Sequence, residues 1–292
     1  MERLGVASEI GYVYLQARQV NSQVTTILSW ISVDARGPSG IYIVADSRIT
    51  WGSASSRWDS GRKVFACRSA DIFGYCGDVL YPTLALSQLG DLVDRGLLWD
   101  SGLDAHARHT KFFDYVKASF GRRHNAPEYN FSIVHCARDG KGLTASFHIW
   151  KVRYQATSRE WIDEPINVGN PSKSMVLLQL GSGREALDRE IMTWAAGSQG
   201  GTSRSIFSAF CDSLEKGLDP LSGGIPQIVS LDRRSGGQVI GFIAKGTRYL
   251  YGLPIQALPE LASIMWVDAL FQRMSPETLT LLPQAQRHAR AR

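Results

Sequence analysis

Hydrophobic and polar positions along the chain form short runs that predict two blocks of strands, each followed by two helices. Residues 25–33 alternate loosely between apolar and polar side chains, and residues 41–45 form a second β-rich run. The turn-rich stretch 34–40 lies between them, so these strands are expected to form a hairpin with a rather long loop. Further strands are expected at residues 62–66, 71–76, 130–137, 144–154, 175–180, 227–231, 239–244 and 248–253.

Four segments carry apolar residues at helical spacing and predict helices. These are residues 78–98, 104–122, 184–196 and 202–216. Asp78 is a suitable N-cap for the first, and Pro82 is tolerated there because it lies near the helix start. No linker interrupts the order of elements, so a core of sheet packed on sheet, with helices outside, is expected.

The C-terminal part of the chain predicts an additional amphipathic helix from Pro259 to Met274. Residues 275–277 could cap one last short helix before the basic tail, residues 287–292. This extension could pack on the core or on a neighbouring subunit. The apolar side of the longer helix would consist of Leu261, Ile264, Met265, Leu270 and Phe271.

Composition narrows the class of protein without identifying it. Of the 292 residues, 44% are hydrophobic and 20% are charged, which is ordinary for a soluble globular chain. The net charge of +5 is spread along the chain, which favours a solvated surface over nucleic-acid binding. No apolar run approaches the roughly 18–20 residues that span a bilayer. Residues 1–24 contain Glu2 and Glu9 where a secretory signal has an apolar region, so a cytoplasmic location is expected.

Neither the cysteines nor the histidines predict a metal or cofactor site. The cysteines lack paired or metal-ligand spacing, and small buried residues of a cytosolic protein are expected. His106 and His109 could share one helix face, but this is more typical of a helix surface than of a metal site. The four cysteines are Cys67, Cys76, Cys136 and Cys211.

Four short motifs with chemically useful side chains follow one another in a definite order. Each is weak alone, but the order is specific, and fourteen residues separate Lys63 from Gly77. The motifs are Thr-Thr-Ile-Leu at 25–28; Ala-Asp-Ser-Arg-Ile-Thr at 45–50, followed by Lys63-Val64; Gly77 at a strand-to-helix junction, with Gly-Ser-Gly at 181–183 at a similar one; and Asp-x-x-Ser-Gly-Gly at 219–224.

Together these motifs resemble the proteasome β-subunit family and its bacterial two-ring peptidase relatives, over residues 25–253. The resemblance implies the N-terminal-nucleophile hydrolase fold, an α+β, four-layer αββα sandwich of two stacked antiparallel sheets flanked by helices. Residues 25–254 would form this domain. Residues 1–24 would be an N-terminal extension, propeptide or mis-assigned start, and residues 255–292 a C-terminal helical extension with a basic tail.

The resemblance also implies a catalytic role for several residues. The Thr25 hydroxyl would attack the scissile carbonyl, while the free α-amine of the same residue takes the proton, through a water. Lys63 would lie near this hydroxyl and lower its pKa, and Asp46 would pair with Lys63 and hold it charged. The backbone N–H of Gly77 would contribute to an oxyanion hole.

The remaining motif residues match supporting groups of the same family. Ser182, Asp219 and Ser222 would orient the threonine amine and its relay water, and Arg48 would be a structural residue beside the site. Non-catalytic readings stay open at this point. Thr25 could be an ordinary strand threonine, and Asp46 and Lys63 a structural ion pair, as in non-catalytic subunits. Gly77 and the two serines could simply serve tight turns, and Asp219 could be a surface residue.

Alignment of the motifs assigns the substrate-binding S1 pocket to Ile49, Phe65, Tyr75 and Val79, with Thr83 as a further candidate. Because Phe65 and Tyr75 are large, a shallow, uncharged pocket for small or medium apolar P1 residues is expected. No metal ion or cofactor is expected to take part.

One departure from the family concerns the residue before the nucleophile. Val24 stands where glycine usually precedes the threonine, and its β-branched side chain makes efficient self-cleavage doubtful. A GTG codon at Val24 could be the true start, so that methionine removal exposes Thr25. If residues 1–24 persist instead, the amine is blocked and the chain is a scaffold or zymogen. Two smaller departures are the long hairpin loop before Asp46 and Asp78 after the glycine.

The leading functional prediction is therefore a threonine-type endopeptidase acting on peptides or unfolded proteins. The resemblance implies a homo-oligomeric ring or double ring, with an ATP-dependent unfoldase as a candidate partner. The chain itself has no Walker-type nucleotide motif. Two alternatives stay open: a non-catalytic ring or interaction subunit, and an N-terminal-nucleophile amidase acting on a small molecule.

Overall fold

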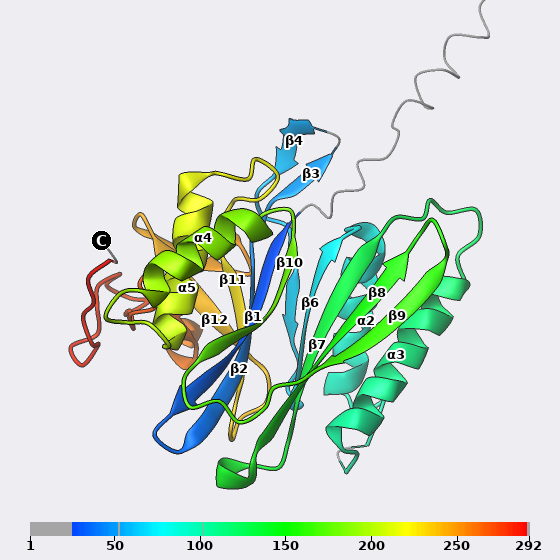
Figure 1. The fold of residues 1–292 in the computed structure, drawn as a ribbon, viewed down its shortest axis with the longest axis horizontal. Coiled ribbons are helices and arrows are strands. Elements are labelled where there is room, and N and C mark those ends of the chain that lie inside the picture. Colours follow the sequence, from blue (N-terminus) through cyan, green and yellow to red (C-terminus); the bar gives the residue numbers. More distant parts are fainter. Residues whose placement is uncertain (1–24, 52, 101, 291–292) are drawn as a thin grey trace, which may run out of the picture.

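The computed structural model describes residues 25–51, 53–100 and 102–290 as a mixed α+β structure (Figure 1). Its sheets are mostly antiparallel, and within the described residues four α-helices pack against them. The strand and helix order expected from the sequence is largely confirmed, with the exceptions described below. None of the helices in this part of the chain has the length and apolar character needed to cross a bilayer.

The larger sheet has eight strands in the order β10-β1-β2-β11-β12-β13-β14, with β15 beside β12. All of its pairs are antiparallel except β12 with β15. The strands are β1 (Thr26–Asp34), β2 (Gly37–Ala45), β10 (Met175–Gly181), β11 (Gln227–Asp232), β12 (Gln238–Ala244), β13 (Thr247–Leu250), β14 (Leu253–Ile255) and β15 (Met265–Val267).

The second sheet has five antiparallel strands in sequence order. They are β5 (Val64–Ala66), β6 (Asp71–Gly77), β7 (Phe131–Asp139), β8 (Ser146–Gln155) and β9 (Glu160–Ile166). The two sheets face each other across a buried apolar cluster to which both contribute, including Ile27 and Ile43 from one sheet and Val134 from the other. The two sheets pack closely at Gly74 of β6, where a Cβ would lie only 2.7 Å from Ile27 Cδ1.

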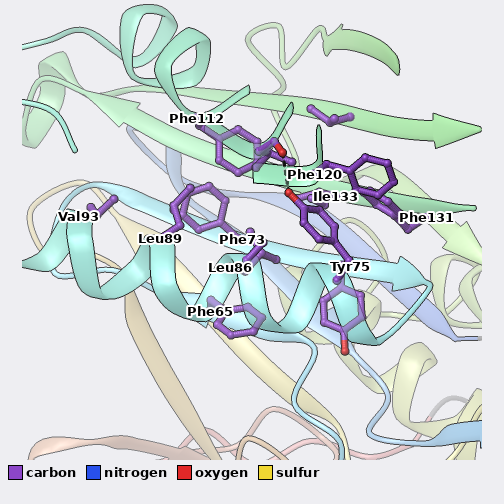
Figure 2. Packing of buried hydrophobic residues seen from close by; sticks show 14 of the residues in the cluster. Phe65, Phe73, Tyr75, Leu86, Leu89, Val93, Phe112, Phe120, Phe131 and Ile133 are labelled. Carbon is purple, nitrogen blue, oxygen red and sulfur yellow. Dashed lines mark hydrogen bonds between the residues drawn. The ribbon is translucent and has the colours of Figure 1, made fainter. Parts of the chain in front are cut away.

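Helices cover the outer face of each sheet. A second buried cluster, rich in aromatic rings, joins the five-stranded sheet to its helices and includes Phe73, Leu86 and Phe112 (Figure 2). A third cluster joins the eight-stranded sheet to its own pair and includes Trp30, Leu187 and Phe207. The first pair is α2 (Leu80–Asp94) and α3 (Ala105–Gly121), and the second is α4 (Arg184–Ala195) and α5 (Ser203–Lys216).

The loop between β1 and β2 is shorter than the sequence suggested. Asp34 pairs with Gly37, so only Ala35 and Arg36 form the turn. Gly37 has a φ of +99°, which a glycine adopts without strain, and Arg233 donates to the carbonyl oxygens of Gly37 and Pro38. The turn-forming residues at 34–40 had indicated a long loop. In the structure, residues 37–40 belong to β2 and pair with residues 32–34, and Arg233, which is distant in the sequence, holds them there.

Three strands that precede β10 in the chain were missed. β9 follows β8 directly in the chain. It was not predicted because its sequence, Glu-Trp-Ile-Asp-Glu-Pro-Ile, mixes polar and apolar residues. The hairpin of β3 (Ile49–Trp51) and β4 (Ser53–Trp58) lies at the edge of the molecule near the start of β1 (Figure 1). Trp51 and Trp58 are 58% and 50% exposed, so this hairpin lacks the burial pattern that marks a strand in sequence.

The prediction of an amphipathic helix at Pro259–Met274 was wrong. Residues Pro259–Ser263 form a short 3-10 helix, and β15 then pairs in parallel with β12. The Trp266 ring covers Gly241, where a Cβ would lie 2.3 Å from its Cε3, and the indole N–H donates to Leu261 O. Contact with the sheet thus outweighs local helical spacing. The last short helix, expected to begin near residues 275–277, is only a single turn. The Ser275 hydroxyl accepts hydrogen bonds from the backbone N–H groups of Glu277 and Thr278.

Candidate active site

Three predicted site residues meet where three strands begin or end. Thr25 precedes β1, Asp46 follows β2 and Lys63 precedes β5. Lys63 Nζ lies 2.9 Å from Thr25 Oγ1 and 2.8 Å from Asp46 Oδ1, and it also donates to the backbone carbonyl of Arg48. Lys63 and Asp46 are fully buried. The structure therefore brings the proposed nucleophile, cation and carboxylate into direct contact.

The buried Asp46 carboxylate is fully supplied with donors. Oδ1 accepts from Lys63 Nζ and, at 3.0 Å, from Thr26 N–H. Oδ2 accepts from the backbone N–H groups of Arg48 at 3.1 Å and Gly223 at 3.0 Å. A buried ion pair is tolerated when hydrogen bonds satisfy its remaining lone pairs, as they do here.

Burial lowers the pKa of the Lys63 ammonium, and the adjacent Asp46 carboxylate opposes that shift. Two of the three contacts of Nζ, with Asp46 and with the Arg48 carbonyl, are to groups that can only accept. The third contact is the Thr25 hydroxyl. The side chain is thus held by two fixed acceptors and aimed at a single hydroxyl.

Thr25 has an unusual backbone conformation. Its φ is +127°, a region that β-branched residues rarely enter and that costs of order 1–3 kcal/mol. Gly181 makes this arrangement possible, because a Cβ there would lie 1.7 Å from Thr25 O. The φ torsion includes the carbonyl carbon of the preceding residue. A chain that begins at Thr25 has no such torsion, so loss of the preceding residues would release this strain.

A second polar cluster surrounds Asp219. Its Oδ2 accepts from Ser182 Oγ and Ser222 Oγ, each at 2.6 Å. Ser222 Oγ also lies 2.7 Å from Thr26 Oγ1. The three predicted supporting residues therefore come together from distant parts of the chain, on the loop before α4 and the loop before β11.

Arg48 ties this second cluster to the first. Its guanidinium bonds Asp59 at 2.7 and 3.0 Å and donates to the carbonyl oxygens of Pro220 and Ser222. The hydrogen bonds that the guanidinium donates to the Asp59 carboxylate raise the pKa of Arg48. Gly223 leaves room for it, since a Cβ there would lie 2.5 Å from Arg48 Cζ. Arg48 thus lies between the two clusters, and its structural role stays a prediction.

Gly77 ends β6 with a φ of +96°, and a Cβ there would lie 2.4 Å from Asn130 O. The turn alone therefore requires glycine. Asp78 then accepts from the Leu80 and Tyr81 N–H groups at 3.3 Å each. The N-cap of α2 is Val79, one residue later than expected. The role of Gly77 as an oxyanion donor stays a prediction.

The predicted S1 residues are mostly interior. Phe65 and Tyr75 are buried in the aromatic cluster of Figure 2, and Val79 packs against it. The Tyr75 hydroxyl donates to Arg62 O and accepts from Thr83 Oγ1. Ile49 is also buried and lies over Gly61. The S1 assignment of these residues stays a prediction. A groove of about 310 Å³ lies elsewhere, between α2 and residues 123–129.

Two residues that support the site were missed by sequence reasoning. Thr26 contacts both polar clusters, as described above. Gln227, at the start of β11, accepts from Lys63 N–H at 3.0 Å and donates to the carbonyl oxygens of Asp46 and Gly61. The only local signal for Gln227 was its position as a polar residue at the start of a buried strand.

The four cysteines are buried and free, as expected. The expectation of a surface position for His109 was wrong. Its Nδ1 lies 2.9 Å from Nδ1 of His135, and its Nε2 faces Asp163. His135 is fully buried with Nε2 3.1 Å from Asp71, and burial lowers its pKa to about 4. The partner residues lie on other strands, so helix spacing could not indicate this network.

Among the residues that the structure describes, no group of three or more His, Cys, Asp or Glu side chains could hold a metal ion. Comparison of the chain with protein-family models and with curated protein sequences finds no match.

Proposed function

We propose that this chain is a threonine-type peptide hydrolase of the proteasome-like N-terminal-nucleophile class, with Thr25 as the nucleophile. One observation carries the proposal. A fully buried lysine, paired with a fully buried aspartate, places its Nζ 2.9 Å from the Thr25 hydroxyl. A buried cation is costly, and an ion pair needed only for stability is readily replaced by apolar residues. Its direct contact with a nucleophile candidate favours a chemical role.

The architecture supports the same proposal. Two facing sheets, each with a pair of helices on its outer side, have the layer order of the αββα sandwich of this hydrolase class. The nucleophile candidate directly precedes β1, an inner strand of one sheet, and the lysine directly precedes β5, an edge strand of the other. We assign the hydrolase domain to residues 25–254.

In the proposed reaction, Thr25 Oγ attacks the carbonyl carbon of the peptide bond as its proton passes to the α-amine of the same residue. The peptide C–N bond then breaks as the leaving nitrogen takes up this proton, and water hydrolyses the acyl ester that remains on Thr25 Oγ. An α-amine has a reference pKa of about 8, so a useful fraction is neutral near pH 7. As a cation, Lys63 favours the ionised hydroxyl. The hydroxyls of Ser182 and Ser222, held by Asp219, would orient the amine and a water. The N–H of Gly77 would stabilise the oxyanion.

The assembly, location, substrates and partner of the chain are proposed from the sequence resemblance alone. The chain would assemble into a homo-oligomeric ring or double ring in the cytoplasm. It would degrade peptides or unfolded proteins, with apolar P1 residues preferred and an ATP-dependent unfoldase as a partner.

The decisive experiment compares two forms of the chain, all 292 residues and a form in which an initiator methionine directly precedes Thr25. Intact mass reports whether Thr25 is the first residue. A peptide epoxyketone, which reacts with the hydroxyl and amine together, should label Thr25 only where the amine is free. The same form should cleave fluorogenic peptides with an apolar P1 residue.

Thr25→Ala should abolish cleavage and labelling. Ser29→Ala is the matched control: it removes another buried hydroxyl of the same strand, one that bonds Tyr42 O, and should leave both intact. A folded chain with a free Thr25 that neither cleaves nor reacts would favour a non-catalytic subunit. Cleavage of small amides without peptides would favour an amidase. Active protein that retains Met1 would contradict the mechanism.

A further inference from the structure

Thr26, the residue after the proposed nucleophile, joins the two polar clusters of the site. Its backbone N–H donates to Asp46 Oδ1, the oxygen that also accepts from Lys63 Nζ. Its hydroxyl lies 2.7 Å from Ser222 Oγ. The residue is 1% exposed, so bulk water cannot replace either contact.

The direction of the hydrogen bond between Thr26 and Ser222 follows from the neighbouring groups. A carboxylate only accepts, so Ser222 gives its single hydroxyl proton to Asp219 Oδ2. Ser222 Oγ must then accept from the Thr26 hydroxyl. The result is an oriented chain from Thr26 through Ser222 to Asp219, which ends on a charge and is therefore strong.

The surrounding backbone leaves space for this hydroxyl. A Cβ on Gly183 would lie 1.9 Å from Thr26 Oγ1 and 3.2 Å from Asp219 Oδ2, so only glycine lets the three groups converge. The two neighbouring hydroxyls reach different partners. Thr25 reaches Lys63, and Thr26 reaches Ser222.

We propose that Thr26 is a positioning residue of the active site, and this rests on the proposed function above. Its hydroxyl anchors the start of β1 to Ser222 and Asp219, and its N–H anchors it to Asp46. Together these hold the Thr25 hydroxyl against Lys63 Nζ. A displacement of about 1 Å in a reacting group can lower a rate about 100-fold.

The test uses Thr26→Val, Thr26→Ser and Ser29→Ala in the form of the chain that carries the free Thr25 amine. Thr26→Val keeps the shape and removes the hydroxyl, so kcat for a fluorogenic peptide should fall about 10- to 100-fold with little change in KM. The rate of epoxyketone labelling at Thr25 should fall in parallel. Thr26→Ser restores a hydroxyl and should recover most of both rates. Ser29→Ala should behave as the parent chain.

Each other result overturns the inference. A parental kcat in Thr26→Val would refute the positioning role while leaving the peptidase proposal in place. Equal losses of kcat and of melting temperature in Thr26→Val and Ser29→Ala would mean that the hydroxyl only stabilises the strand. A parent chain that neither cleaves nor reacts would remove the proposed function and this inference with it.

Discussion

At the scale of single residues, the buried ion pair of Lys63 and Asp46 carries a large desolvation cost. Each charge has lost its water, and each is compensated by the other and by backbone groups. Removing one partner leaves the other charge buried and unpaired, which costs far more than the pair contributes.

Asp46→Asn should therefore lower the free energy of unfolding by about 3–5 kcal/mol, because the buried ammonium loses its counter-charge. Urea unfolding at pH 7 measures this. Asp59→Asn is the matched control, since Asp59 also pairs with a cation, Arg48, but its side chain is 40% exposed. That change should cost about 1 kcal/mol or less. Equal costs at the two positions would show that burial of the pair contributes nothing.

His135 carries a second residue-scale prediction. Its pKa in the folded state is about 4, below the reference value of about 6.5, because burial disfavours the cation. The unfolded chain thus binds more protons between these values, and stability is lost as the pH falls from about 6.5 towards 4. The loss from this one group between pH 7 and pH 5 should be on the order of 2 kcal/mol.

Urea midpoints from pH 7.5 to 4.5 would measure the effect, with His135→Gln expected to flatten this dependence. His106→Gln provides the comparison, because that imidazole is on the exposed side of α3 and should leave the slope unchanged. If all three chains show one slope, other groups govern the pH dependence.

At the scale of elements, strands and helices with a buried face were predictable, because alternation and helical spacing are local properties. β7 and α5 illustrate this, with ends within a few residues of those expected. The elements that were missed lack such a pattern. β3 and β4 are largely exposed, and β15 is added to the sheet only through contact with β12.

Gly241 tests whether β15 and its neighbours belong to the folded core. Gly241→Ala places a Cβ where the Trp266 ring lies, so we expect a loss of about 1–3 kcal/mol and earlier proteolysis within residues 255–290. Thermal unfolding and limited proteolysis report the two effects. Gly121→Ala, on α3 with open space around it, should have neither effect. An unchanged proteolysis pattern would mean that the segment is held without Trp266.

At the scale of the whole molecule, the two facing sheets bring residues from five separate segments to one site. Thr25, Asp46, Lys63, Ser182 and Ser222 are distant in sequence and joined by hydrogen bonds in the structure. The arrangement depends on the packing of both sheets, so changes in the shared core should reach the site.

Assembly is the prediction that belongs to this scale. The 292-residue chain has a mass of 32.3 kDa, and native mass spectrometry should detect a large multiple of the mass of the form that is purified. A ring would restrict the access of long substrates to the site, so disruption of the proposed assembly at low concentration should change cleavage of long substrates more than of short peptides. A stable monomer with full activity would contradict the ring.

The sequence by itself determined the order of most strands and helices, and its resemblance to a known family suggested the side chains of the candidate site. Those features follow from local alternation, capping and motif order. Only the tertiary structure decided that Lys63 touches both Thr25 and Asp46, that Thr26 links the clusters and that His109 is buried. It also decided that residues 265–267 form a strand. These depend on contacts between residues far apart in the chain, whose free energy outweighs local preference.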